Sequence, residues 1–159
     1  MNGKQKIIAD ISIGVFLSSL IFSLVMYCVR KPQSRYVYYF NSFDTEKICC
    51  ETRRRQGNSS KEKPDEKINY FVSDLLLGPM TNRYKYLFNP SATLEFCFVD
   101  GKVLNVGLSS QALKLSPEYS SLKEGVQLLR FNIVKNFTNI DKVNVFLGGV
   151  SIYEDKDKS

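Results

Sequence analysis

The side chains that could carry chemistry in this sequence are carboxylates, cysteines and tyrosines, because its 159 residues include no histidine. This absence excludes Ser-His-Asp and Cys-His nucleophilic sites, histidine-ligated zinc and histidine acid/base catalysis. The candidate carboxylates Glu51, Asp74, Glu95 and Asp100 are scattered over the predicted elements, and acid/base work requires two carboxylates in one cleft with separated pKa values. We therefore expect no catalytic residues and no enzyme, with a carboxylate-dependent enzyme as the alternative.

The four cysteines Cys28, Cys49, Cys50 and Cys97 lack the C-x-x-C spacing of metal and thioredoxin-like sites. Neighbouring strand residues point to opposite faces, so Cys49 and Cys50 are poorly placed to bond each other or to share a metal. We expect no metal site and no cofactor. The simplest interpretation is small buried apolar side chains. A disulfide from Cys49 or Cys50 to Cys97 stays open, because an extracytoplasmic compartment can be oxidising.

Aromatic and basic residues offer two further binding hypotheses. Tyr36, Tyr38 and Tyr39 could form an aromatic platform for a ligand, although aromatic residues favour strands and the core interpretation is preferred. The net charge of +6 is spread along the chain, whereas nucleic-acid binders concentrate charge in a stripe. The dense run at residues 53–55 is interpreted as a solvated strand end. We expect no nucleic acid among the partners.

The clearest structural element is a β-hairpin at residues 93–109. Its turn is expected at Asp100-Gly101, because both residues tolerate the positive φ angles of a type I′ turn. Amphipathic helices are expected on either side of it in sequence, at residues 65–77 and 121–137. Gly78-Pro79 ends the first helix, and a Ser121/Glu124 capping box begins the second.

Three further strands are expected at residues 36–40, 47–53 and 143–147. The second should have one face in water, and Gly148-Gly149 should close the third. The order β-β-α-β-β-α-β predicts a single α+β domain, with a mixed β-sheet packed by two helices.

An apolar segment precedes this domain. Residues 11–29 carry no charge, and as a helix they would span about 28 Å, close to the hydrocarbon thickness of a bilayer. We expect an uncleaved transmembrane anchor. A signal peptide is disfavoured because residues 25–27 offer no small cleavage-site residue, and a lipoprotein modified at Cys28 is disfavoured by the bulky Tyr27 before it.

The charges flanking this segment leave its orientation open. Arg30, Lys31 and Arg35 follow it and would draw that end towards the cytoplasm, while Lys4 and Lys6 oppose them. The expected organisation is a short N-terminal segment, the anchor, a juxtamembrane linker, the α+β domain and a charged tail, at residues 1–10, 11–29, 30–35, 36–150 and 151–159.

The order of the elements, and the residues at which they begin and end, resemble the GerM domain family, which is associated with bacterial sporulation and spore germination. Glu51-Thr52-Arg53 resembles the family's E-x-R after the second strand, and residues 71–79 resemble its helix ending in L-L-x-G-P. Asp100-Gly101 with the two residues after it resembles the hairpin turn, and residues 143–149 the closing strand and glycine. The resemblance covers residues 36–149.

The resemblance implies an extracytoplasmic domain that residues 11–29 hold to lipid in the bacterial cell membrane, as a single-pass or lipoprotein-like envelope protein. It carries over no catalytic residues and implies an interaction or assembly module whose partner is an envelope protein or the cell wall. A domain binding cell-wall glycan or a small ligand is the alternative of another class.

Overall fold

The computed structural model divides the chain into two compact units, residues 1–33 and 34–159. It describes residues 3–29, 35–45, 47–55 and 63–152. The predicted 30–35 linker, except for Arg35, and residues 153–159 of the predicted tail lie outside the described residues. The first unit contains the helix α1 (Gly3–Val29), which begins well before the predicted residue 11.

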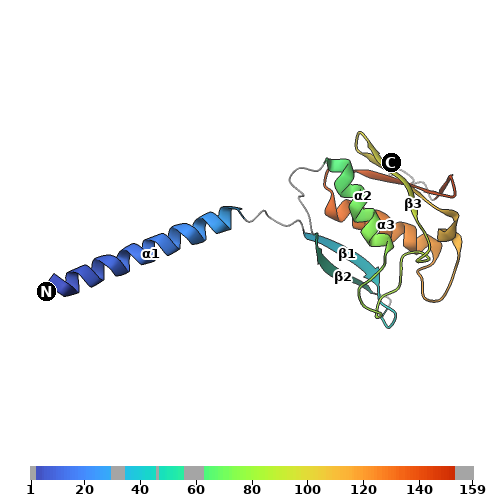
Figure 1. Ribbon diagram of the computed structural model, residues 1–159. Coiled ribbons are helices and arrows are strands. Elements are labelled where there is room, and N and C mark those ends of the chain that lie inside the picture. Colours follow the sequence, from blue (N-terminus) through green and yellow to red (C-terminus); the bar gives the residue numbers. More distant parts are fainter. Residues whose placement is uncertain (1–2, 30–34, 46, 56–62, 153–159) are drawn as a thin grey trace. The chain divides into compact units, whose positions relative to one another are not determined.

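The second unit has the predicted α+β composition and element order (Figure 1). Its strands and helices are β1 (Arg35–Asn41), β2 (Ile48–Arg54), α2 (Pro64–Leu76), β3 (Leu94–Asp100), β4 (Val103–Leu108), α3 (Leu122–Asn136) and β5 (Lys142–Leu147). Two short elements were not predicted: the 3₁₀ helix η1 (Ser110–Leu113) and the strand β6 (Val150–Ile152).

The strands form two sheets where a single sheet was predicted. A four-stranded sheet has the order β3-β4-β5-β6, and it is mixed as expected, because β4 and β5 are parallel and the other pairs antiparallel. β1 and β2 form a separate antiparallel sheet with a continuous seven-residue register. The prediction of one sheet was wrong because strand patterns in a sequence indicate strands, not which strands pair.

Both helices begin and end as their sequences indicate. The Ser121 hydroxyl accepts a hydrogen bond from the Glu124 amide, and the Glu124 carboxylate accepts one from the Ser121 amide at 2.9 Å, which confirms the predicted capping box. Gly78 follows α2 at φ 88°, where a side chain would be strained and would also collide with the Tyr86 ring. Glycine is therefore required there for conformation and for space.

The turns differ from the prediction in a way that backbone geometry explains. Asp100 pairs with Val103, so the hairpin loop consists of Gly101 and Lys102, one residue later than expected. Gly101 at φ 61° occupies the glycine position of type II′ turns. Gly148 and Gly149 have φ angles of 55° and 82°, which suits a type I′ turn, and they lead into β6 instead of ending the sheet.

The hydrophobic core joins both helices to both sheets. α2 packs beside β3, and α3 contacts both β1 and β5, so α3 lies between the two sheets (Figure 1). Leu129 and Ile133 of α3 and Phe71 and Leu75 of α2 are completely buried. The amphipathic stripes in the sequence therefore face the core as predicted.

Candidate functional site

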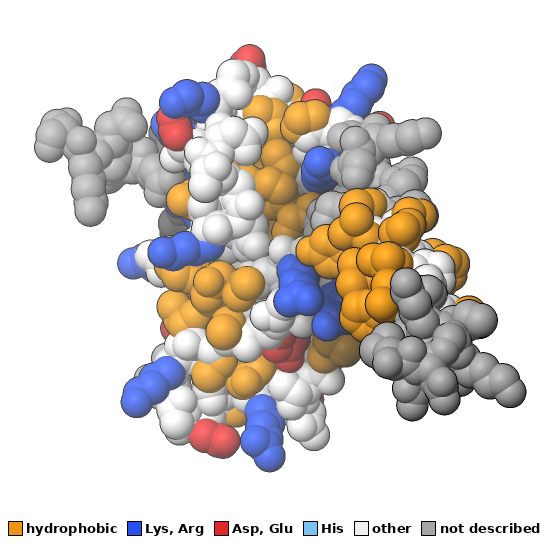
Figure 2. All heavy atoms as spheres, turned by 90° about the vertical axis from the view of Figure 1, so that its left-hand side faces the viewer, with side chains coloured by type: hydrophobic (Ala, Val, Ile, Leu, Met, Phe, Trp, Pro, Cys, Tyr) orange, Lys and Arg blue, Asp and Glu red, His pale blue; other side chains and the backbone are white. Residues whose placement is uncertain are grey.

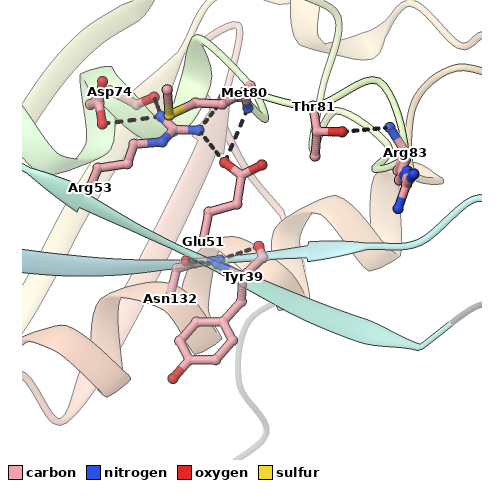
Figure 3. A network of polar contacts seen from close by, with 9 residues as sticks. Tyr39, Glu51, Arg53, Asp74, Met80, Thr81, Arg83 and Asn132 are labelled. Atoms are coloured by element: carbon pink, nitrogen blue, oxygen red, sulfur yellow. Dashed lines mark hydrogen bonds and ion pairs between the residues drawn. The ribbon is translucent and has the colours of Figure 1, made fainter.

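The described charged residues with the most specific geometry surround Arg53 on β2. Its Nη1 lies 3.1 Å from the Asp74 carboxylate of α2 and also donates to the Asp74 backbone carbonyl. Its Nη2 lies 3.1 Å from the Glu51 carboxylate and donates to the Gly78 carbonyl at 2.6 Å. Figure 3 shows the guanidinium between the two carboxylates. Arg53 therefore binds β2 to the C-terminal end of α2.

Contacts with aromatic rings and with the following loop complete this arrangement. The guanidinium carbon of Arg53 lies 4.5 Å from the Tyr38 ring centre, a cation–π distance. The Glu51 carboxylate also accepts a hydrogen bond from the Met80 amide at 3.1 Å. We call Glu51, Arg53, Asp74, Gly78 and Met80 the Arg53 cluster.

The Arg53 cluster pairs both of its carboxylates with one shared guanidinium. The side chains of Arg53, Glu51 and Asp74 are 12%, 13% and 22% exposed, so each ion pair is largely shielded from water. Burial, assisted by the Asp74 carboxylate, raises the pKa of the Tyr38 phenol above its ordinary range. The arrangement is suited to holding β2 against α2, because Arg53 hydrogen-bonds both carboxylates.

The candidate carboxylates are thus divided by the structure. Glu51 and Asp74 come together, on Arg53, while Glu95 and Asp100 are exposed residues of β3. The sequence did not predict that Glu51 and Asp74 lie together, and Arg53 was predicted to be exposed to solvent. Within residues 53–55 only Arg54 is exposed, because Arg55 is buried with its guanidinium 4.0 Å from the Tyr70 ring centre. The prediction of a solvated strand end was therefore wrong for two of the three arginines.

The predicted tyrosines lie in the core. Tyr36 and Tyr38 are 8% and 1% exposed, and both rings pack on Phe71. Tyr39, on the opposite face of β1, packs edge-on against Phe131 of α3, with ring centres 4.9 Å apart. This confirms the core interpretation for Tyr36 and Tyr38, whose rings are not available to stack on a ligand, while Tyr39 is half-buried.

Other aromatic residues line an open groove that the sequence did not indicate. The groove has a volume of about 420 Å³. Its lining combines apolar and hydrogen-bonding side chains: Phe43, Pro79, Met80, Thr81, Asn82, Tyr84, Tyr86 and Glu118. We call it the tyrosine groove. Most of these residues belong to the segment between α2 and β3, where the available signal was a run of aromatic residues without periodicity.

The cysteines are all free in the structure, and Cys97 lies in a different sheet from Cys49 and Cys50. Cys50 is exposed, while Cys49 and Cys97 are half-buried. Among the residues that the structure describes, no group of three His, Cys, Asp or Glu side chains could hold a metal ion.

The charge on the surface is dispersed. In the space-filling view of one face, Lys and Arg side chains are spread over the surface and interrupted by uncharged groups (Figure 2). This face carries no continuous basic stripe of the kind that nucleic-acid binding uses.

α1 is the described helix with the length and composition to cross a membrane. The apolar window runs over Ile11–Cys28, and its side chains are exposed. A membrane anchor and a signal sequence both have these properties.

Models of known protein families and curated protein sequences give no match to the chain. Solved structures do. Tandem GerMN domains of the sporulation protein GerM from Bacillus subtilis match with a TM-score of 0.56 and 17% identity, over 74% of this chain and 39% of that chain. The first GerMN domain of the same protein matches with a TM-score of 0.51 and 15% identity, over 75% of this chain and 86% of that one.

At these identities the likeness concerns the fold, and the chain spans about two fifths of the tandem structure's length. Two motifs that carry the GerM resemblance also contact each other in space. Arg53 of the E-x-R motif donates to the Gly78 carbonyl, and Glu51 accepts from the amide of Met80, the residue after Pro79. The resemblance is confirmed at the level of the fold: the unit at residues 34–159 has a GerMN-like fold.

Proposed function

We propose that α1 anchors this chain in a bacterial membrane and that residues 34–159 form an extracytoplasmic, non-catalytic module for interaction or assembly in the cell envelope. The observation that carries the proposal is a GerMN-like fold that follows, in the sequence, an apolar helix long enough to span a bilayer. The Arg53 cluster supports the non-catalytic role, because Glu51 and Asp74 are both bound to Arg53 and join two elements of the fold.

The location is tested with an epitope tag after Ser159 and a membrane-impermeant labelling reagent on intact cells. We expect the tag to be labelled without lysis, because the domain lies outside the cytoplasm. A cytoplasmic marker protein should be labelled only after lysis. Labelling of the tag only after lysis would reverse the orientation and reject the extracytoplasmic proposal.

The nature of the anchor is tested by intact mass spectrometry of the membrane-extracted protein. We expect the full-length chain, because Tyr27 is bulky at the position where lipoprotein processing prefers a small residue. A mature chain that begins with an acylated Cys28 would show that lipid modification replaces the helical anchor.

The interaction role is tested by crosslinking in membranes, with mass spectrometry of the attached proteins. We expect crosslinks from residues 34–159 to an envelope protein. The matched control is a chain that keeps residues 1–33 but carries an unrelated domain in place of residues 34–159. Recovery of the same partners with the control would assign the interaction to the anchor and contradict the proposal.

The tyrosine groove supports a second candidate function, binding of cell-wall glycan. Sugar rings stack on aromatic faces, and Thr81, Asn82 and Glu118 supply hydrogen-bonding groups to the same groove. The test is sedimentation with purified peptidoglycan. Loss of co-sedimentation in Tyr84→Ala, but not in Tyr70→Ala at an exposed tyrosine of α2 outside the groove, would favour glycan binding. Equal behaviour of the two variants would reject it.

A further inference from the structure

The two edges of the β1–β2 sheet differ in how their backbone groups are satisfied. At the β1 edge, the Asn132 amide group accepts from the Tyr39 N–H at 2.8 Å and donates to the Tyr39 carbonyl at 2.9 Å. Asn136 binds Val37 in the same way, at 3.0 and 2.7 Å. Farther along, the Asn41 carbonyl accepts from the Lys85 N–H at 2.8 Å. This edge is closed.

The spacing of the two asparagines explains how a helix can close a strand edge. Four residues of helix rise about 6 Å, and two residues of strand advance about 6.6 Å. Asn132 therefore lies opposite Tyr39, and Asn136 lies opposite Val37. Each side-chain amide supplies one donor and one acceptor to the strand. α3 takes the place of a third strand.

The alternation of backbone groups then fixes what β2 presents on its other side. In an antiparallel pair, residues that bond across to the partner alternate with residues whose N–H and C=O point outward. The backbone N–H and C=O groups of Val37 and Tyr39 point to α3. The hydrogen-bonded pairs within the sheet are therefore Tyr38 with Glu51 and the pairs two residues to either side, Tyr36 with Arg53 and Phe40 with Cys49. Their neighbours Cys50 and Thr52 consequently direct their N–H and C=O groups to the outside.

This outer edge has the properties of a pairing site. Among the described strands, β2 pairs with β1 alone. Its register is continuous, without the bulge or proline that commonly protects an edge. Ile48, Cys50, Thr52 and Arg54 are exposed along it.

We propose that the outer edge of β2 binds an extended, acidic segment of a partner protein as an added strand, which deepens the proposed interaction function and rests on it. Within residues 47–55, Arg53 and Glu51 are paired in the Arg53 cluster and Arg55 is buried, so the exposed charges are Lys47 and Arg54, and both are positive. Arg54 is exposed and pairs across the sheet with the exposed Arg35, which concentrates positive charge at one end. Backbone pairing supplies the affinity, and these charges select acidic side chains.

Charge also distinguishes this partner from a second copy of the chain. Antiparallel self-pairing of β2 would bring the exposed Arg54 of one copy close to the exposed Lys47 of the other. Like charges brought together across an interface oppose binding. An acidic strand meets no such opposition.

The test measures binding of short fluorescent peptides to the full chain in detergent micelles. The probe is a seven-residue peptide in which glutamate alternates with valine. Its controls are the same peptide with lysine for glutamate and a glutamate peptide N-methylated along its backbone. We expect the glutamate peptide to bind at least about tenfold more tightly than either control, because only it has both the charge and the backbone donors.

Two variants with matched controls locate the binding. Thr52→Pro removes an N–H that points out of the sheet, so it should lower the affinity about tenfold or more, while Thr52→Val should leave it within about twofold. Arg54→Glu should weaken the glutamate peptide about tenfold, while Lys114→Glu makes the same charge change at an exposed residue elsewhere and should have little effect. Arg54→Glu serves if Thr52→Pro does not fold.

A residue-specific readout completes the test. Hydrogen exchange followed by NMR should show slowing at the Cys50 and Thr52 amides when the peptide binds, because these two amides gain acceptors. The inference is overturned if the glutamate peptide fails to bind, if N-methylation leaves its binding unchanged, or if exchange at these amides does not slow. A dimer of the full chain that Thr52→Pro dissociates would assign the edge to a second copy and also overturn it. The topology assay does not depend on peptide binding, so failure of the proposed function is recognised separately.

Discussion

The two sheets of this domain are held together by different means. The four-stranded sheet relies on its own backbone ladders, from β3 through β6. The two-stranded sheet has one ladder and is fastened at its sides by polar side chains, by Asn132 and Asn136 along β1 and by Arg53 to α2. A two-stranded ribbon is marginal in water by itself. β1 also buries Tyr36, Tyr38 and Phe40 in the core, so single substitutions at the polar contacts should weaken the attachment of this sheet without detaching it.

The largest effect is expected where both sheets depend on the same side chain. Leu129 is completely buried in α3 between the sheets, so Leu129→Ala should lower the free energy of unfolding by about 2 to 5 kcal/mol, from lost burial and a cavity. Denaturant melts of the fragment 34–159 measure this. Arg54→Ala, at an exposed residue, should change the free energy by less than about 0.5 kcal/mol. The reverse result would place α3 with its other face to the core.

Asn132→Ala should act on the two-stranded sheet by removing its fastening to α3. The side chain is completely buried, and its loss leaves the Tyr39 N–H and C=O without their partner, for an expected loss of about 2 to 4 kcal/mol. Asn144→Ala is the matched control, since the Asn144 amide bonds only the Asn105 side chain among the described contacts and is half-buried. We expect faster hydrogen exchange at Tyr39 in the first variant and little change there in the second.

Arg53→Met should weaken the attachment of β2 to α2. It keeps much of the side-chain volume but leaves Glu51 and Asp74 without their cation, and we expect a loss of about 2 to 3 kcal/mol, below the value for fully buried pairs because these groups keep some exposure. Lys102→Met breaks the exposed pair with Asp141 and should cost less than about 1 kcal/mol. Equal losses in chemical denaturation would mean that the Arg53 cluster contributes no more than a surface ion pair.

The smallest effect is expected in the reactivity of the cysteines, which compares Cys50 of the two-stranded sheet with Cys97 of the four-stranded sheet and needs no substitution. Burial, assisted by the Asp65 carboxylate, raises the pKa of the Cys97 thiol to about 11. Because thiolates are the reactive form, iodoacetamide at pH 8.5 should modify the exposed Cys50 well before Cys97, as followed by mass spectrometry of the fragment 34–159. Equal rates, or a disulfide between Cys97 and Cys49 or Cys50, would contradict the structure.

The same thiol predicts a pH dependence of stability. The folded pKa of Cys97 exceeds the unfolded value of about 8.5, so the folded state binds the proton more tightly. Its contribution is fully present below about pH 8.5 and is lost as the pH rises towards 11. Cys97→Ala should reduce this alkaline loss of stability, and an unchanged alkaline profile would contradict the assignment.

The sequence by itself determined the elements and their order, because helix stripes, caps and strand alternation are local patterns. The Ser121/Glu124 capping box, the Gly78 helix end and the membrane-length apolar segment could all be read from neighbouring residues. The family resemblance rested on such local motifs too, and the fold agrees with it. The hairpin was found as well, with its turn misplaced by one residue.

Only the tertiary structure decided which polar residues meet. Arg53 and Asp74 are 21 residues apart and Tyr39 and Asn132 are 93 apart, so no local pattern connects either pair. The side of β2 that carries Glu51 and Arg53 faces inward, because Arg53 pairs with carboxylates and contacts aromatic rings there. Ile48, Cys50 and Thr52, on the other side, face water. Strand alternation fixes that two faces exist, but the partners across the fold determine which face is buried, since a buried charge requires a paired one.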